Sequence, residues 1–229
     1  MKPSCRRLCG RSHCDAMDAV IFDLDGTLWD SRENVTNSWN VILRRRHPEL
    51  APFTAEAIGG QMGKLLIDIG RALLPDIPET QLRELMDECC SYECEYVAEH
   101  GGVLYDGLED TLRTLSKKYR LYIVSNCQSG YIEAFFAAHG LERYYEDYRD
   151  NGTSGLLKAA NIKLIIEQNK LSSAVYVGDT ALDGASAREN GIPFVLAGYG
   201  FGDSDDFDAR IDDIRDLPEV LAEMDKAQA

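Results

Sequence analysis

The chain has 229 residues, of which 45% are hydrophobic, and a formal net charge of -15. This length and composition are typical of a globular protein with a substantial hydrophobic core, and no apolar run approaches the ~20 residues of a membrane span. The negative charge disfavours binding to nucleic acids and to anionic membranes, so an anionic ligand would need a local positive site.

The first sixteen residues contain three of the seven cysteines, at a spacing that matches no common zinc site. They are basic, and they lack the apolar region that a secretory signal needs. We therefore expect residues 1–16 to be a disordered extension. Seven cysteines without regular spacing fit a reducing, cytoplasmic setting better than a disulfide framework.

The first predicted strand covers residues 19–22, a short apolar run with the β-branched and aromatic content of a buried strand. Asp23 and Asp25 follow, and Gly26 allows the chain to bend there. In an open parallel sheet the carboxyl ends of the strands line the ligand crevice, so both carboxylates could face it. They could bind a hard cation such as Mg2+, or one could act as a nucleophile. On these residues alone, a surface turn at the Asp-Gly pair is an equally good explanation.

Only helices are predicted between residues 32 and 102. The first starts near Asp30 or Ser31, either of which can cap it, and it ends at about Arg46. Two more helical patterns cover residues 63–74 and 79–100. Because this block interrupts a chain that otherwise alternates between strands and helices, we interpret residues 32–102 as an inserted all-helical cap domain.

From residue 103 the pattern becomes α/β. Strands are predicted at 121–124, 174–177 and 193–196, and helices at 107–118, 130–139, 158–169, 181–190 and 211–224. Residues 144–151 are interpreted as a short strand with a loop, and the Gly-rich residues 152–155 as a flexible connector. The alternation predicts a Rossmann-like, doubly wound parallel sheet, formed by residues 17–31 and 103–229.

Three further groups of polar residues stand at strand ends or helix starts. Ser125 and Asn126 follow the second predicted strand and can hold phosphate oxygens, although a simple turn would also explain them. Lys158 begins a helix, where its ammonium group and the free backbone amides can bind an anion together. Asp179 follows the third predicted strand, with Asp183 four residues later, and helix capping is the alternative role for Asp179.

The sequence Asp23-Leu24-Asp25-Gly26-Thr27 resembles the first motif of the haloacid dehalogenase superfamily of phosphohydrolases. The three other polar groups resemble the second, third and fourth motifs, in the order that the family has. The chain is similar to the capped, phosphoglycolate-phosphatase-like members, over about residues 18–221. This resemblance implies an enzyme that hydrolyses a small phosphorylated metabolite, a phosphate monoester, with Mg2+ as its cofactor.

The resemblance also implies a role for each motif residue. Asp23 is expected to be the nucleophile that forms an aspartyl-phosphate, and Asp25 the general acid and base. Mg2+ is expected to be held by Asp23, the backbone carbonyl of Asp25, and Asp179. Asp183 is expected to support the water shell of the metal or to orient the lysine of the third motif. The residues expected to bind the phosphoryl group are Ser125, Asn126 and Lys158.

Substrate choice is expected to depend on the cap domain and on the Gly-rich loop at residues 198–202. Residues 59–64 are a polar, Gly-rich break between helical patterns, suited to a loop over the crevice. Gln61 and Lys64 are the candidate specificity residues in this loop. Lys64 could meet a second anionic group of the substrate, and the alternative is a solvated surface lysine.

Two other functions use the same residue types. A phosphomutase would pass the phosphoryl group between two positions of a sugar with the same motifs. A receiver-like signalling domain, phosphorylated on an aspartate, also combines acids, a hydroxyl, a lysine and Mg2+ on a doubly wound sheet. The helical insert and the order of the first motif disfavour the receiver.

Overall fold

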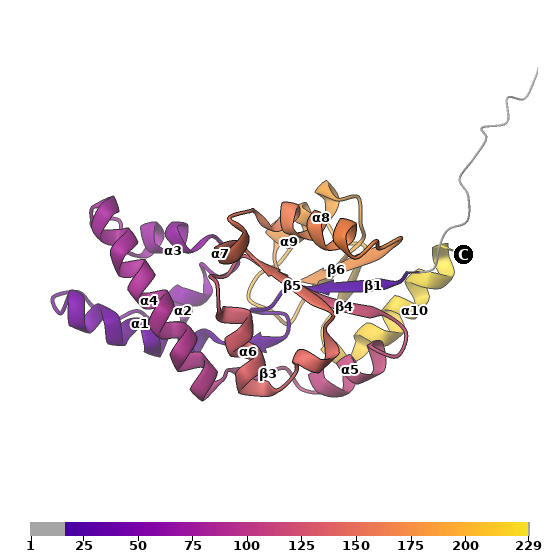
Figure 1. Cartoon of the computed structure of the whole chain (residues 1–229), viewed down its shortest axis with the longest axis horizontal. Coiled ribbons are helices and arrows are strands. Elements are labelled where there is room, and N and C mark those ends of the chain that lie inside the picture. Colours follow the sequence, from indigo (N-terminus) through magenta and orange to yellow (C-terminus); the bar gives the residue numbers. More distant parts are fainter. Residues whose placement is uncertain (1–16, 229) are drawn as a thin grey trace, which may run out of the picture.

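The computed structural model describes residues 17–228, so the extension expected at 1–16 lies outside the described residues. Figure 1 shows two parts side by side, a sheet covered by helices and a group of helices without a sheet. Among the helices of residues 17–228, none combines the length and the apolar character needed to cross a membrane.

A six-stranded parallel sheet forms the centre of the larger part, and its strand order is β5-β4-β1-β6-β7-β8. It confirms the doubly wound α/β prediction, and each of the three strands predicted after residue 103 lies within two residues of its expected bounds. The strand β8 was not predicted. The strands are β1 (Ala19–Phe22), β4 (Arg120–Ser125), β5 (Asp147–Asp150), β6 (Ala174–Gly178), β7 (Phe194–Ala197) and β8 (Ala209–Ile211).

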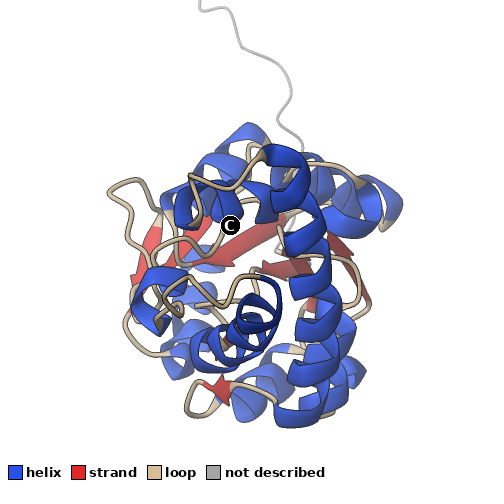
Figure 2. Cartoon of the chain, turned by 90° about the vertical axis from the view of Figure 1, so that its left-hand side faces the viewer, coloured by secondary structure: helices blue, strands red, loops and turns tan. Residues whose placement is uncertain are grey.

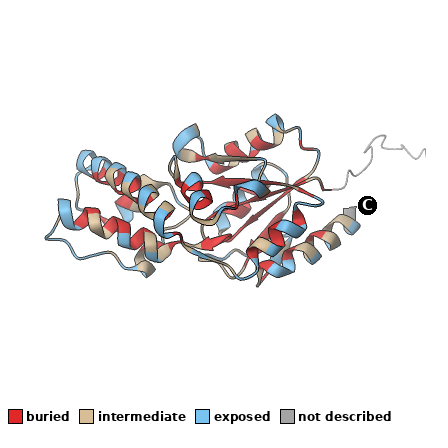
Figure 3. Cartoon of the chain, turned by 60° about the horizontal axis from the view of Figure 1, so that its bottom comes forward, coloured by how far each residue is buried: buried red, intermediate tan, exposed pale blue. Residues whose placement is uncertain are grey.

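The middle strand β1 is buried on both faces because its side chains alternate between two cores. Ala19 and Ile21 pack in a core with α8 and α9, whereas Val20 and Phe22 pack in a core with α5, α6 and α10. A continuous apolar run is the expected sequence of such a strand. Figure 3 shows the buried residues in the strands and on the inner sides of the helices. These helices are α5 (Leu108–Leu115), α6 (Tyr131–His139), α8 (Lys158–Gln168), α9 (Ala181–Glu189) and α10 (Leu217–Gln228).

The group of four helices lies between β1 and the rest of the sheet in the sequence, where only helices were predicted. The long helix α4 has the predicted bounds, α3 starts three residues later than predicted, and α2 was not predicted. Figure 2 looks onto this end of the molecule, where the helices stand in front of the sheet. The helices are α1 (Arg32–Arg46), α2 (Ala55–Gly59), α3 (Leu66–Leu73) and α4 (Glu79–His100).

The two connections between the helical group and the sheet lie next to each other. The short strands β2 (Trp29–Asp30) and β3 (Val103–Leu104) form an antiparallel pair, with Trp29 opposite Leu104. The Asn34 side-chain amide also donates to the Gly101 carbonyl at 2.6 Å, which ties the start of α1 to the end of α4. The chain therefore leaves the sheet part and returns to it at one place.

Two predictions for the second half of the chain were wrong. The flexible connector at 152–155 is mostly the short helix α7 (Asn151–Ser154), capped by Asp150, whose carboxylate accepts from the Thr153 amide at 2.6 Å. The helix predicted at 211–224 begins later, because the chain first completes β8 and a 3-10 turn, Ile214–Asp216, before α10. Short elements of this kind are fixed by tertiary contacts more than by local sequence pattern.

Candidate active site

Three neighbouring strands bring the predicted site residues together. β1 lies between β4 and β6, and in a parallel sheet all carboxyl ends share one edge. Asp23 follows β1, Ser125 ends β4, and Asp179 follows β6. The side chains of these three residues are almost completely buried. The motifs that are far apart in the sequence therefore meet at one end of the sheet.

A buried lysine joins two of the carboxylates. Lys158, the first residue of α8, places its Nζ atom 2.9 Å from Asp23 Oδ1 and 2.6 Å from Asp183 Oδ1. Asp183 also caps α9, since its other oxygen accepts from the Thr180 amide at 2.9 Å and from the Thr180 hydroxyl at 2.7 Å. The structure thus places Asp183 in direct contact with Lys158, as one of its two expected roles requires.

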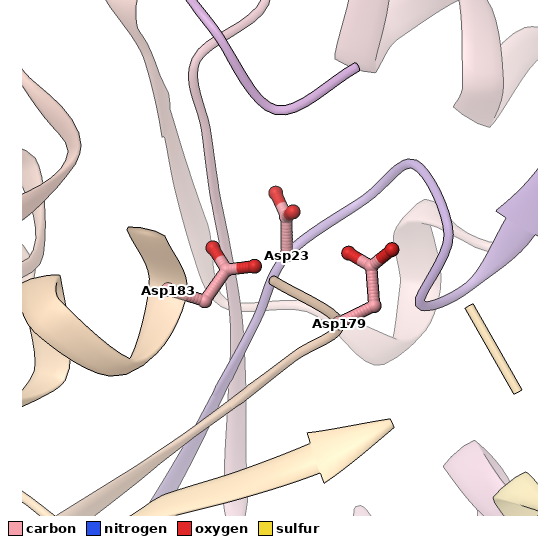
Figure 4. Close-up of side chains that lie close together, drawn as sticks. All are labelled: Asp23, Asp179 and Asp183. Atoms are coloured by element: carbon pink, nitrogen blue, oxygen red, sulfur yellow. The ribbon is translucent and has the colours of Figure 1, made fainter. Parts of the chain in front are cut away.

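The carboxylates of Asp23, Asp179 and Asp183 form a cluster in which one oxygen of each lies within 4.8 Å of the others. Figure 4 shows that they come from three segments: the end of β1, the loop after β6, and the first turn of α9. Three carboxylates around one lysine leave the cluster short of positive charge. A hard cation with oxygen ligands would supply that charge.

The pKa shifts of the residues in this cluster reflect the same lack of positive charge. Burial raises the pKa of Asp23 well above its usual value, Lys158 opposes this only in part, and the neighbouring carboxylates add to it. Burial and the charge of Asp183 raise the pKa of Asp179 to about 7. Burial alone would lower the pKa of Lys158, but the two carboxylates raise it well above its usual value, so the lysine is charged.

One carboxylate oxygen of Asp179 accepts hydrogen bonds, and the other has no hydrogen-bond partner. Its Oδ2 accepts from the backbone amides of Phe201 at 2.7 Å and Gly202 at 3.2 Å. Its Oδ1 is buried and has no hydrogen-bond partner. A buried oxygen without a donor is costly unless a cation binds it, so this residue fits a Mg2+ ligand.

Gly26 allows the first motif to approach Asp179 closely. Its φ angle is +77°, and a Cβ atom there would lie 2.2 Å from Asp179 Oδ2. A side chain at this position would therefore be strained and would displace the carboxylate.

Asp25 lies apart from the three-carboxylate cluster and is held by residues that the sequence analysis did not identify. Its Oδ1 accepts from Trp29 Nε1 at 2.9 Å, from Tyr131 Oη at 3.0 Å and from the Ser31 hydroxyl. Burial nevertheless raises its pKa above the usual value. A partly buried carboxyl group with a raised pKa is suited to deliver a proton.

Asn126 links the second motif to the helical group. Its side-chain amide donates to the Gly63 carbonyl at 2.9 Å, while its own Oδ1 is buried and without a partner. Asn126 and Ser125 lie beside Asp23 and Asp25 in the wall of one small pocket, with a volume of about 50 Å³.

The two candidate specificity residues lie at different distances from this pocket. Lys64 forms part of the wall, although it is exposed, and its Nζ atom donates to Gln61 Oε1 at 2.8 Å. Gln61 does not line the pocket. The structure therefore brings Lys64 to the pocket wall, and Gln61 contacts the lysine without lining the pocket itself.

The chain is similar in sequence to one protein family and to several individual phosphatases. Residues 20–197 match the model of a family described as haloacid dehalogenase-like hydrolase. The chain is 28% identical to a plasmid-encoded phosphoglycolate phosphatase of Cupriavidus necator, covering 89% of this chain and 92% of that protein. It is 30% identical to the phosphoglycolate phosphatase of Rhodospirillum rubrum, covering 80% of each. It is 26% identical to a 5'-nucleotidase of Pseudomonas aeruginosa, over 83% and 86%.

Solved structures share the fold. A haloacid dehalogenase-like family protein of Streptococcus pneumoniae superposes with a TM-score of 0.77 at 24% identity, covering 91% of this chain and 98% of that one. A structure described as a predicted phosphoglycolate phosphatase of Haemophilus somnus gives 0.79 at 20% identity, covering 89% and 97%.

Proposed function

The chain belongs to the haloacid dehalogenase-like hydrolases, and we propose that it hydrolyses a small phosphate monoester with Mg2+ through an aspartyl-phosphate intermediate. One observation carries this proposal. A buried Asp23 lies at the end of the central strand, beside a charged Lys158, and a second carboxyl group with a raised pKa follows two residues later. This pairs a nucleophile with a proton donor next to a site for phosphate oxygens.

In the first step, an oxygen of Asp23 attacks phosphorus in line with the ester oxygen, and the P–O bond to the alcohol breaks. Asp25 gives its proton to the leaving oxygen. In the second step, Asp25, now a carboxylate, takes a proton from water, and the water oxygen attacks phosphorus. The bond between phosphorus and the Asp23 oxygen breaks, inorganic phosphate leaves, and both carboxyl groups return to their first states.

The remaining motif residues hold the phosphoryl group during both steps. The Ser125 hydroxyl, the Asn126 backbone amide and the Lys158 ammonium group donate to its oxygens. Such fixed donors supply much of the stabilisation in phosphoryl transfer. Asp23, the backbone carbonyl of Asp25, and Asp179 would hold Mg2+, which when bound neutralises charge between carboxylate and phosphate.

The test is a panel of phosphate esters with inorganic phosphate as the measured product, and Asp23→Asn as the control. We expect multiple turnovers by the wild-type protein and none by the variant. Sugar phosphates in the panel separate hydrolysis from isomerisation, because a phosphomutase would yield an isomer without free phosphate. A receiver-like domain would stop after one phosphorylation.

We propose that residues 32–102 act as the cap domain on a catalytic core formed by residues 17–31 and 103–229. The pocket supports this division, because its wall combines the motif residues of the core with side chains of α1 to α4. We also propose a cytoplasmic location. Free thiols fit a reducing compartment, and the described part of the chain holds Cys89, Cys90, Cys94 and Cys127 unpaired.

Replacing Lys64 tests whether the loop at 59–64 selects substrate. We expect Lys64→Ala to raise KM for the best ester of the panel several-fold and to change kcat little, because this side chain lies in the pocket wall and outside the reacting cluster. Lys163→Ala, which removes an exposed lysine on α8, is the matched control. Unchanged kinetics of Lys64→Ala would show that this lysine is only a solvated surface residue.

A further inference from the structure

Glu93 is a buried acid in the substrate pocket that the mechanism above does not use. It lies on α4, only 4% of its surface is exposed, and it lines the same pocket as Asp23 and Asp25. Its Oε2 accepts from the indole nitrogen of Trp39, on α1, at 2.5 Å. Glu93 therefore lines the pocket from the helical group, whereas the motif residues line it from the sheet part.

No cation in residues 17–228 neutralises this carboxyl group. Fully buried glutamates are rare unless they are paired, and none of the ion pairs within 4.0 Å in the described chain includes Glu93. The only basic residue that these described residues contribute to the pocket wall is Lys64, which is exposed and donates to Gln61. Burial, and to a smaller extent the charge of Asp25, raises the pKa of Glu93 to about 8, against the lowering effect of hydrogen bonds with Trp39 and Gln128, so near neutral pH the group ionises fully only when a cation lies beside it.

The rest of the wall that the helical group contributes is almost entirely apolar. Its side chains come from α1, α2, α3 and the loop before α3. They are Val35, Trp39, Ile58, Met62, Leu66 and Ile69. Such surroundings make an unpaired carboxylate costly and make its attraction to a cation strong. A ligand cation that enters this pocket would supply Glu93 with the charge partner that the described residues do not provide.

We propose that Glu93 is a specificity-determining residue that pairs with an ammonium group on the alcohol part of the substrate, so that the preferred esters are aminoalkyl phosphates. This inference rests on the phosphatase function proposed above. A structural role alone, as acceptor for the Trp39 indole, would be met equally well by glutamine. The same geometry disfavours esters with a carboxylate, which would lie beside Glu93 without a cation.

The test compares esters of two to four carbons that end in an ammonium group with esters of the same length that end in a hydroxyl group. We expect the wild-type protein to prefer the ammonium ester at least ten-fold in kcat/KM at one length. Phosphoglycolate, which carries a carboxylate, should be hydrolysed more slowly than 2-hydroxyethyl phosphate.

Glu93→Gln keeps an acceptor for Trp39 and removes the charge. We expect it to lose the preference for the ammonium ester, mainly through a higher KM, while its kcat/KM for the hydroxyl ester changes less than three-fold. Glu95→Gln is the matched control, because Glu95 lies on the same helix but is exposed. It should behave like the wild-type protein.

Two results would overturn the role of Glu93. One is a wild-type protein that hydrolyses the hydroxyl esters and shows no preference for ammonium at any length, a result that needs no folded variant. The other is a preference that survives in Glu93→Gln. Either result leaves the phosphatase function intact, whereas the absence of phosphate release from every ester would contradict that function itself.

Discussion

The Asp25→Asn variant is expected to accumulate a covalent aspartyl-phosphate, whereas Asp23→Asn is expected to form none. The first variant keeps the nucleophile and loses the proton donor and acceptor. General acid–base groups contribute about 100- to 10,000-fold, so steady-state turnover should fall by that order. An activated aryl phosphate needs little protonation of its leaving group, so formation of the intermediate should suffer less than its hydrolysis.

The structure shows why Asp25→Asn is a clean substitution. The Oδ1 atom of Asp25 accepts three hydrogen bonds, and an asparagine oxygen can accept the same three from Trp29, Ser31 and Tyr131. Because these contacts persist, the variant should unfold at nearly the wild-type temperature. A large loss of thermal stability would mean that turnover falls because the variant is poorly folded, and not because the acid and base group is missing.

Mass spectrometry of the intact proteins after an acid quench measures the intermediate. The added mass of one phosphoryl group should appear in Asp25→Asn and be absent from Asp23→Asn. Peptide mapping should then place the phosphoryl group on Asp23. Equal labelling of the two variants, or a label on another residue, would overturn the assignment of Asp23 as nucleophile.

Removal of divalent metal is expected to abolish turnover, and Ca2+ is expected to inhibit in competition with Mg2+. The buried carboxylates of Asp23, Asp179 and Asp183 lie close together with one lysine between them, so phosphate would be repelled without a further cation. Mg2+ demands compact octahedral geometry, whereas Ca2+ accepts more ligands and can bind a carboxylate through both oxygens. If Ca2+ bound both oxygens of Asp23, neither oxygen would be free to attack phosphorus.

Thermal unfolding gives a measure of metal binding that does not depend on turnover. A ligand that binds only the folded state raises the melting temperature with concentration, so Mg2+ should stabilise the wild-type protein. Asp179→Asn should show a smaller rise. Full activity after dialysis against EDTA would contradict a metal-dependent reaction, and an equal rise in both proteins would show that Asp179 is not a ligand.

The parts of the site that follow strands could be predicted from the sequence, because a short apolar run marks the strand and the next polar residue marks its end. Asp23, Ser125 and Asp179 are of this kind, and the structure places all three at one edge of the sheet. Lys158 stood out by its position at the start of a helix, and the roles expected for all four residues came from their resemblance to the family's motifs. In each case the local pattern contains both the element and its boundary.

The residues that support the site could not be found in this way. Tyr131 reaches Asp25 across 106 positions of sequence, and Glu93 meets Trp39 across 54. Nothing in the neighbourhood of either residue distinguishes it from an ordinary side chain on a buried helix face. Such partners depend on how helices pack against one another, and one sequence carries no local signal for that packing.

The pairing of β2 with β3 has a consequence for how such enzymes diversify. Both ends of the helical group emerge from adjacent positions of one antiparallel pair, so the whole segment stands where a hairpin loop would otherwise be. A segment attached in this way can be lengthened, shortened or exchanged without shifting the register of the sheet strands on which the reacting carboxylates depend. If the helical group acts as the proposed cap, replacing this one contiguous stretch of the gene would change the substrate range and leave the chemistry unchanged.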